Sequence, residues 1–233
     1  MVVVVAVISL LASLLFPAFS RAREAGRGTV CRSNLRQLSL ALQVYAGDYR
    51  DTLPWPGEAN RNADPDWVWG GHSIAQLALA SAWQQPNFGF HAETGSLFPY
   101  TTSEARHLTT ARNSTGFPVY RCPSSGKLGS ALRVNYSLNA RFDPGLHGVE
   151  SEGVKLSRIA HFSRKVAFVN EDPRVMRDAA FEPVGTAASG LFVRHHGRAI
   201  FAFLDGHLEA FRDLGLRAAQ LAPRSDELFS AYQ

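Results

Sequence analysis

Residues 2–19, VVVVAVISLLASLLFPAF, contain no charged side chain. As a helix with a rise of about 1.5 Å per residue, they would extend roughly 27 Å, close to the ~30 Å hydrocarbon core of a bilayer. Eleven of residues 2–16 are Val, Ile, Leu or Phe, and each favours the bilayer centre by about 0.3 to 0.6 kcal/mol. We therefore predict that residues 1–20 form the membrane-spanning half of a long helix. The side chains expected to meet lipid or a neighbouring helix include Val5, Ile8, Leu11, Leu15, Phe16, Pro17 and Phe19.

Two other interpretations of this stretch fit less well. A cleavable secretory signal needs a basic segment before the apolar run and a small-x-small cleavage site after it, and the flanks here match that pattern poorly. A buried core helix is disfavoured because the apolar side chains outweigh the two serines, Ser9 and Ser13. By the positive-inside rule alone, the arginines that follow the run, Arg21, Arg23 and Arg27, would place the rest of the chain in the cytoplasm.

The remainder of the chain is long enough for one domain with its own core. The chain has 233 residues, and most of them follow the apolar run. The net charge of +4 comes from arginines scattered along the chain and not from one dense basic segment. Because a nucleic-acid footprint needs clustered basic residues, we expect no nucleic-acid partner.

Residues 21–50 continue the helix as an amphipathic half. Leu35, Leu38, Leu42 and Tyr45 recur at spacings of three and four residues, which places them on one helical face. That face is expected to pack under a folded head, and Pro17 is expected to kink the helix because it removes a backbone donor. The solvated face is predicted to carry Arg32, Arg36, Ser39 and Gln43.

Residues 51–116 are predicted to form a loop-rich insert with a helical segment at 73–83, because turn-forming residues dominate its first part. Four tryptophans fall in this insert. One interpretation makes them a stacking platform for a sugar or another ligand; the favoured one makes them core residues, because large aromatic side chains dominate protein interiors. They are Trp55, Trp67, Trp69 and Trp83.

Residues 117–233 are predicted to form a sheet-containing head with a helical tail. Short runs at 117–121, 132–138 and 165–169 are rich in aromatic and β-branched residues. Residues 199–204 and 207–211 flank Asp205-Gly206, which predicts a hairpin with a type I′ turn. The first arm is apolar on both faces and is expected to be a central strand; the second is expected to expose His207 and Glu209.

Two small groups of residues carry potential chemistry. His195, Asp205 and His207 are weak metal-ligand candidates, but no zinc-hydrolase spacing is present and the turn explains them better. Cys31 and Cys122 are predicted either to form a disulfide, which would close a loop of about ninety residues and add roughly 4 to 5 kcal/mol, or to remain buried thiols. No nucleophile-base pair is recognisable, so we expect no catalytic residue and no enzymatic activity.

The helix and the head both resemble a known family. Phe16-Pro17-x-Phe19-x-Arg21-Ala22-Arg23-Glu24, followed by Cys31, Asn34-Leu35 and Gln37, resembles the N-terminal helix of type IV pilin-like proteins. In particular, the chain is similar to bacterial pseudopilins of the type II secretion kind that end in a His-x9-Asp-Gly signature. The signature residues here are His195, Asp205 and Gly206, and the Cys-Pro loop of the family is matched at Cys122-Pro123.

The resemblance implies an α+β fold in which one long helix lies against a small antiparallel sheet. It implies a non-enzymatic, single-pass subunit of the bacterial inner membrane, with its head in the periplasm or on the cell surface. Such subunits assemble with themselves and other pilin-like subunits, through the secretion or pilus machinery, into a filament. The alternative is a membrane-tethered module that binds an extracytoplasmic glycan or solute. No cofactor is expected; calcium is known in some relatives, but no acidic loop here has the required ligand density.

One departure from the family concerns the start of the chain. The family's short basic leader, its processing glycine and a glutamate five residues into the mature chain would all precede Met1. Either these residues are encoded upstream of Met1, or this copy has lost the site for prepilin peptidase. We favour the first alternative, because a basic leader would also reverse the orientation that Arg21, Arg23 and Arg27 favour. Upstream DNA encoding a sequence similar to Gly-Phe-Thr-Leu-Ile-Glu is the expected finding.

Overall fold

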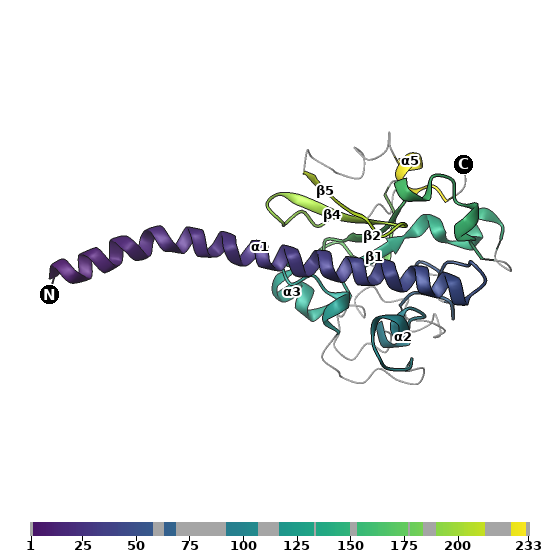
Figure 1. Cartoon of the computed structure of the whole chain (residues 1–233), viewed down its shortest axis with the longest axis horizontal. Coiled ribbons are helices and arrows are strands. Elements are labelled where there is room, and N and C mark those ends of the chain that lie inside the picture. Colours follow the sequence, from purple (N-terminus) through teal and green to yellow (C-terminus); the bar gives the residue numbers. More distant parts are fainter. Residues whose placement is uncertain are drawn as a thin grey trace.

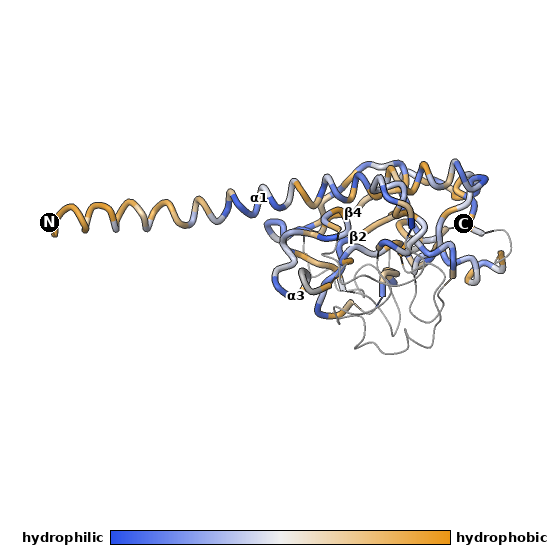
Figure 2. Tube along the Cα trace, turned by 90° about the horizontal axis from the view of Figure 1, so that it is seen from below, coloured by the Kyte–Doolittle hydropathy of each residue, from blue (hydrophilic) through white to orange (hydrophobic). Residues whose placement is uncertain are grey.

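A long helix carries a compact head on its second half (Figure 1). The computed structural model describes residues 2–57, 63–68, 92–106, 117–132, 134–149, 153–176, 178–183, 190–212 and 225–231. Helix α1 spans Val2–Asp48 without interruption, through Pro17. Its first half projects away from the head and is mostly hydrophobic, whereas its second half alternates polar and apolar residues along the head (Figure 2).

The docked half of α1 buries the face that its sequence period predicts. Leu35 and Leu38 are fully buried, and Leu42 and Tyr45 are 1% and 3% exposed. The predicted solvated face is confirmed for Arg32 and Arg36. It is wrong for Ser39, which is fully buried and donates a hydrogen bond to the backbone oxygen of Leu35. A small hydroxyl can enter the interface in this way because the helix itself supplies its acceptor.

The head contains a five-stranded sheet with the strand order β3-β1-β2-β4-β5. The strands are β1 Tyr136–Asn139, β2 Val166–Asn170, β3 Ala180–Phe181, β4 Arg198–Phe203 and β5 Leu208–Arg212. Three of the four pairings are antiparallel, but β3 lies parallel to β1. The α+β fold is therefore confirmed, with one correction: the sheet is mixed. A two-residue edge strand such as β3 has no period that a sequence could reveal.

Strand β4 is an interior strand, as its apolar composition predicts. Ile200 and Ala202 belong to the core between the sheet and α1, while Phe201 and Phe203 belong to a second core on the other face of the sheet. The short helix α5, Ser225–Phe229, supplies Leu228 and Phe229 to this second core. Both faces of β4 are thus covered, which explains why the strand has no polar face.

The hairpin between β4 and β5 is present, but its turn differs from the predicted one. The backbone N–H of Phe203 donates to the oxygen of His207, so three residues form the loop, and the N–H of Gly206 donates to the oxygen of Phe203. Gly206 has a φ of +87°, whereas the φ of Asp205 is not positive. A type I′ turn needs positive φ at both central residues; a three-residue loop needs it only at the glycine.

Two further strand predictions need correction. Residues 117–121 do not form a strand: Pro118–Tyr120 is a 3-10 helix, η3, because Pro118 lacks the backbone donor that a strand ladder needs. In the run 132–138 the strand begins only at Tyr136. The remaining short helices are η2 Ala92–Thr94, α2 Phe98–Thr101, α3 Gly126–Ala131, η4 Ala140–Phe142, η5 Pro144–His147, η6 Leu156–Arg158 and η7 Phe162–Arg164.

Tryptophan Trp67 is a core residue. It is fully buried, and its ring packs on Tyr120 and Phe168 with centroid distances of 5.9 and 5.1 Å. Its Nε1–H donates to the backbone oxygen of Ala179 at 3.1 Å. Trp55 is partly buried, and Trp69, Trp83 and the predicted helix at 73–83 lie outside the described residues. A ligand platform that includes Trp67 is therefore wrong, because no ligand can reach its ring.

Candidate functional site

The first half of α1 is exposed along its whole length. Val5, Ile8, Leu11, Leu15, Phe16 and Phe19 are 55–74% exposed. The most hydrophobic window of the helix has no residue buried within the structure, and its length and composition suffice to cross a membrane. An apolar helix that none of the described residues covers is consistent with a single-pass membrane anchor.

A shallow hollow of about 530 Å³ lies along this exposed half. Small and large side chains alternate around it. Small residues allow the backbone of a second helix to approach closely. The hollow is lined by Ala12, Leu15, Phe16, Ala18, Phe19 and Ala22.

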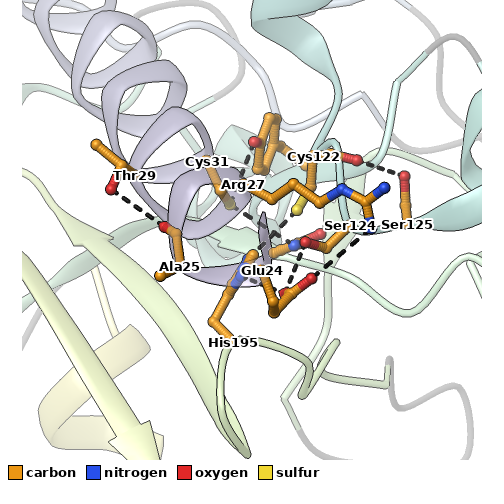
Figure 3. A network of polar contacts seen from close by, with 11 residues as sticks. Glu24, Ala25, Arg27, Thr29, Cys31, Cys122, Ser124, Ser125 and His195 are labelled. Carbon is orange, nitrogen blue, oxygen red and sulfur yellow. Dashed lines mark hydrogen bonds and ion pairs between the residues drawn. The ribbon is translucent and has the colours of Figure 1, made fainter. Parts of the chain in front are cut away.

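A second group of residues lies where α1 enters the head. Cys31 from α1, Cys122 from the segment after η3 and His195 from the segment before β4 converge there (Figure 3). One potential ligand atom from each, both sulfurs and a ring nitrogen, all lie within 4.8 Å of one another. All three residues are buried. We call Cys31, Cys122 and His195 the sulfur-histidine cluster.

Histidine His195 is held by a contact at each ring nitrogen. Its Nε2 lies 3.3 Å from Cys122 Sγ, and its Nδ1 lies 3.2 Å from Oε1 of Glu24. The hydroxyl of Ser124 donates to the same carboxylate oxygen at 2.7 Å. Gly28 allows this approach, because a Cβ there would lie 3.3 Å from Nδ1 of His195.

The sulfur of Cys31 receives further hydrogen bonds from the sheet side. The hydroxyl of Tyr136 donates to Cys31 Sγ at 3.3 Å, and Nδ2 of Asn170 lies 3.8 Å from the same sulfur. The backbone N–H of Cys122 donates to Oδ1 of Asn135 at 2.7 Å, which fixes the loop that carries this cysteine. The cluster is thus built from α1, two loops and the sheet.

These contacts shift the pKa values of the two thiols in opposite directions. The hydrogen bond with Cys31 and the contact with His195 lower the pKa of Cys122 to about 5, against the effect of burial. The hydrogen bond with Cys122 and burial raise the pKa of Cys31 well above its usual value. Burial lowers the pKa of His195, but Cys122 and Glu24 outweigh burial, so this pKa is raised. Cys122 is therefore the more acidic of the two thiols.

A pocket of about 600 Å³ opens on the outer side of His195. Its lining includes the side chains of three arginines, Arg32, Arg198 and Arg212, together with Glu24. Neither cysteine lines the pocket, so a substrate in it would meet His195 and not the sulfur of Cys122.

The predicted site residues separate into two places. His195 precedes β4 and Asp205 follows it, so the strand lies between them and the predicted combination of His195 with Asp205 and His207 does not form. Asp205 and His207 contact each other across the turn, where Nδ1 of His207 lies 2.5 Å from Oδ1 of Asp205. Both thiols are free in the structure, and the disulfide stays a prediction.

Sequence reasoning did not identify Glu24 as a partner of His195. The relevant signal is the spacing of Glu24, Gly28 and Cys31, which places all three on one face of α1. That face continues into Leu35 and Leu38, which the same period identifies as buried.

The fold and its exposed helix define a class: an α+β head carried on one membrane-length N-terminal helix. Residues 20–176 match the family described as "Protein of unknown function (DUF1559)", and the chain belongs to that family. No curated protein and no solved structure matches the chain significantly.

Proposed function

We propose that this chain is a non-enzymatic pilin-like subunit, of the pseudopilin kind, that assembles through its N-terminal helix into a type II secretion or type IV pilus-like filament. The observation that carries the proposal is the contrast within α1. Leu35 and Leu38 are fully buried, whereas Leu11 and Leu15 on the same helix are 55% and 67% exposed. An exposed apolar helix needs lipid or neighbouring helices to cover it, and a filament subunit uses both in turn.

Further features support the proposal. Membership of the matched family is compatible with a membrane-anchored pilin-like subunit. The hollow on the exposed half of α1 offers a second copy of α1 a surface that includes the small residues Ala12, Ala18 and Ala22. We place the head outside the cytoplasm and the anchor in a bacterial inner membrane, with self, other pilin-like subunits and the assembly machinery as partners. The His-x9-Asp-Gly signature belongs to the same proposal.

The alternative, a tethered module that binds a glycan or solute through its tryptophans, is weakened by Trp67. Its ring is fully buried and its Nε1–H is already paired. Of the other three tryptophans, only Trp55 lies within the described residues. No observation on the described head favours this alternative over assembly.

Site-specific photo-crosslinking in membranes tests the assembly proposal. A photoreactive amino acid at Leu11 or Leu15 is expected to give dimers and longer ladders of the chain. The matched control carries the same amino acid at Leu40, which is 52% exposed on the docked half of α1. Ladders from Leu11 that are absent from Leu40 support assembly through the apolar half. Crosslinks to lipid alone at both apolar positions, under conditions of filament production, contradict it.

A further inference from the structure

We propose that the sulfur-histidine cluster is a zinc site, in which Cys31, Cys122 and His195 are the ligands and Glu24 orients the histidine. The proposal does not depend on filament assembly. It assigns a specific role to four residues that α1, the loop after η3 and the segment before β4 bring together (Figure 3).

The first argument is the separation of the ligand atoms. Zinc binds thiolate sulfur at about 2.3 Å and imidazole nitrogen at about 2.0 to 2.1 Å, so tetrahedral ligand atoms lie roughly 3.4 to 3.8 Å apart. Nε2 of His195 lies 3.3 Å from Cys122 Sγ, and both sulfurs and the nitrogen fit within 4.8 Å. The three atoms therefore enclose a volume that one ion can occupy after small side-chain adjustments.

The second argument is the orientation of His195. Metal-bound histidines almost always donate their other ring N–H to a carboxylate or carbonyl, which fixes the tautomer. Here Nδ1 faces Oε1 of Glu24 at 3.2 Å, and Ser124 holds that same oxygen at 2.7 Å. With the ring N–H on Nδ1, facing Glu24, zinc would take the place of the proton on Nε2, and the lone pair of that nitrogen would face Cys122 as a ligand nitrogen requires.

The third argument concerns the surroundings of Cys31. Tyr136 donates to its sulfur, and such donors stabilise a metal-bound thiolate. Asn170 lies beside the same sulfur and is fully buried, yet its Oδ1 has no hydrogen-bond partner among the described residues. With three protein ligands, zinc keeps a fourth position for water, and such a water is a donor that can pair this oxygen.

The ligand types select the metal. Two thiolates and an imidazole favour zinc over calcium or magnesium, which prefer oxygen ligands. The three ligands come from segments far apart in sequence, so the ion would tie α1 to the loop after η3 and to the start of β4. Binding energy at such a site contributes directly to folding.

The test uses the full chain in detergent micelles, purified without added reductant or metal. The bound zinc per chain is measured by inductively coupled plasma mass spectrometry, and free thiols are counted before and after chelation. We expect one zinc per chain, with two thiols that react with an alkylating reagent only after chelation. Replacement of zinc by cobalt is expected to add a sulfur-to-cobalt charge-transfer absorption.

Four variants sharpen the result. Cys122→Ser and His195→Ala remove a ligand and are expected to abolish stoichiometric zinc. Glu24→Gln is expected to weaken zinc binding by about 10- to 100-fold and to retain the cobalt absorption, because it alters only the outer partner of His195. His207→Ala, which changes a histidine outside the cluster, is the matched control and is expected to retain full binding.

Two results would overturn the proposal. One is a disulfide: no free thiols after chelation and a mass lower by two hydrogens than that of the reduced chain. The other is a pair of thiols that react without chelation while zinc is below stoichiometric. If Cys122→Ser fails to fold, Glu24→Gln keeps the test decisive, since unchanged zinc affinity in that variant contradicts the assigned role of Glu24.

Discussion

At the scale of single residues, Trp67 shows how much stability one side chain provides. Its ring is fully buried between Tyr120 and Phe168. Truncation of a buried tryptophan costs about 3 to 5 kcal/mol, so Trp67→Ala is expected to lower the free energy of unfolding by that amount, measured by urea denaturation of the full chain in detergent. Trp55→Ala is the comparison and is expected to cost less, because Trp55 is only partly buried. Equal losses in the two variants would contradict the core assignment.

Asp172 provides a prediction about pH. Burial raises the pKa of this carboxyl group, but the hydrogen bonds and charge of Arg174 outweigh burial and lower it below 3.8. A carboxyl group with a lowered pKa stabilises the fold above its unfolded pKa, and the contribution is lost as pH falls through the folded value.

Arg174→Ala is therefore expected to raise the pKa of Asp172 and to lower stability slightly at neutral pH, with the difference from the unmodified chain disappearing below the folded pKa. The pKa follows from carboxyl chemical shifts in an NMR titration, and stability follows from unfolding at each pH. Arg36→Ala, on the exposed face of α1, is the control and is expected to leave the Asp172 titration unchanged. An unaltered titration in Arg174→Ala would refute the pairing.

At the scale of secondary-structure elements, the docked half of α1 carries leucines in two different environments, so the effect of burial can be measured with the residue type held constant. Leu38 is fully buried, while Leu40, two residues further, is 52% exposed. Leu38→Ala is expected to destabilise the head by about 2 to 5 kcal/mol, and Leu40→Ala by no more than about 0.5 kcal/mol. Thermal or urea unfolding of the two variants decides this. A similar loss in both would mean that the helix docks in a different rotation.

The elements that sequence reasoning predicted correctly are those with a local signal. The buried face of α1 follows from the spacing of its leucines, and β4 follows from an apolar run next to a turn. Two of the wrong predictions, a strand at 117–121 and a type I′ turn at Asp205-Gly206, also have local causes in the backbone. Pro118 removes a strand donor at η3, and a three-residue loop replaces the type I′ turn because only Gly206 takes positive φ.

The sulfur-histidine cluster shows what a single sequence does not contain. Cys122 and His195 are 73 positions apart and Cys31 is farther still from His195, so no local spacing marks them as neighbours. The pairing depends on how α1 crosses the sheet, and that packing is a property of the whole head. The sequence shows only that the spacing of Glu24, Gly28 and Cys31 places them on one face of the helix. It does not show that Cys122 and His195 pack against that face.

At the scale of the whole molecule, the second half of α1 is part of the packed head, whereas the first half is an exposed anchor. The head has cores on both faces of its sheet, so it is expected to keep its structure when the exposed half of α1 is altered. The anchor depends on its surroundings, because the part of the chain that the structure describes does not cover its side chains. Changes in the two halves should therefore have separable effects.

Arginine substitutions at the centre of the apolar run test this separation. The eleven Val, Ile, Leu and Phe side chains of residues 2–16 together favour membrane insertion by roughly 3 to 7 kcal/mol, and each central arginine opposes it by about 2.5 to 3.5 kcal/mol. One arginine, in Leu11→Arg, is expected to reduce membrane association only in part. Two, in Leu10→Arg with Leu11→Arg, are expected to reverse the balance and release the chain from the membrane.

Membrane flotation measures the released fraction, and protease resistance of the head shows that its fold persists. The matched control is Leu40→Arg, which places the same charge on an exposed leucine of the docked half and is expected to leave the chain in the membrane fraction. If the double variant stays with the membrane after an alkaline wash, residues 2–19 are not what holds the chain there. If the head becomes protease-sensitive in the double variant, the two halves of α1 are not independent, because a charge in the anchor would then unfold residues that it does not touch.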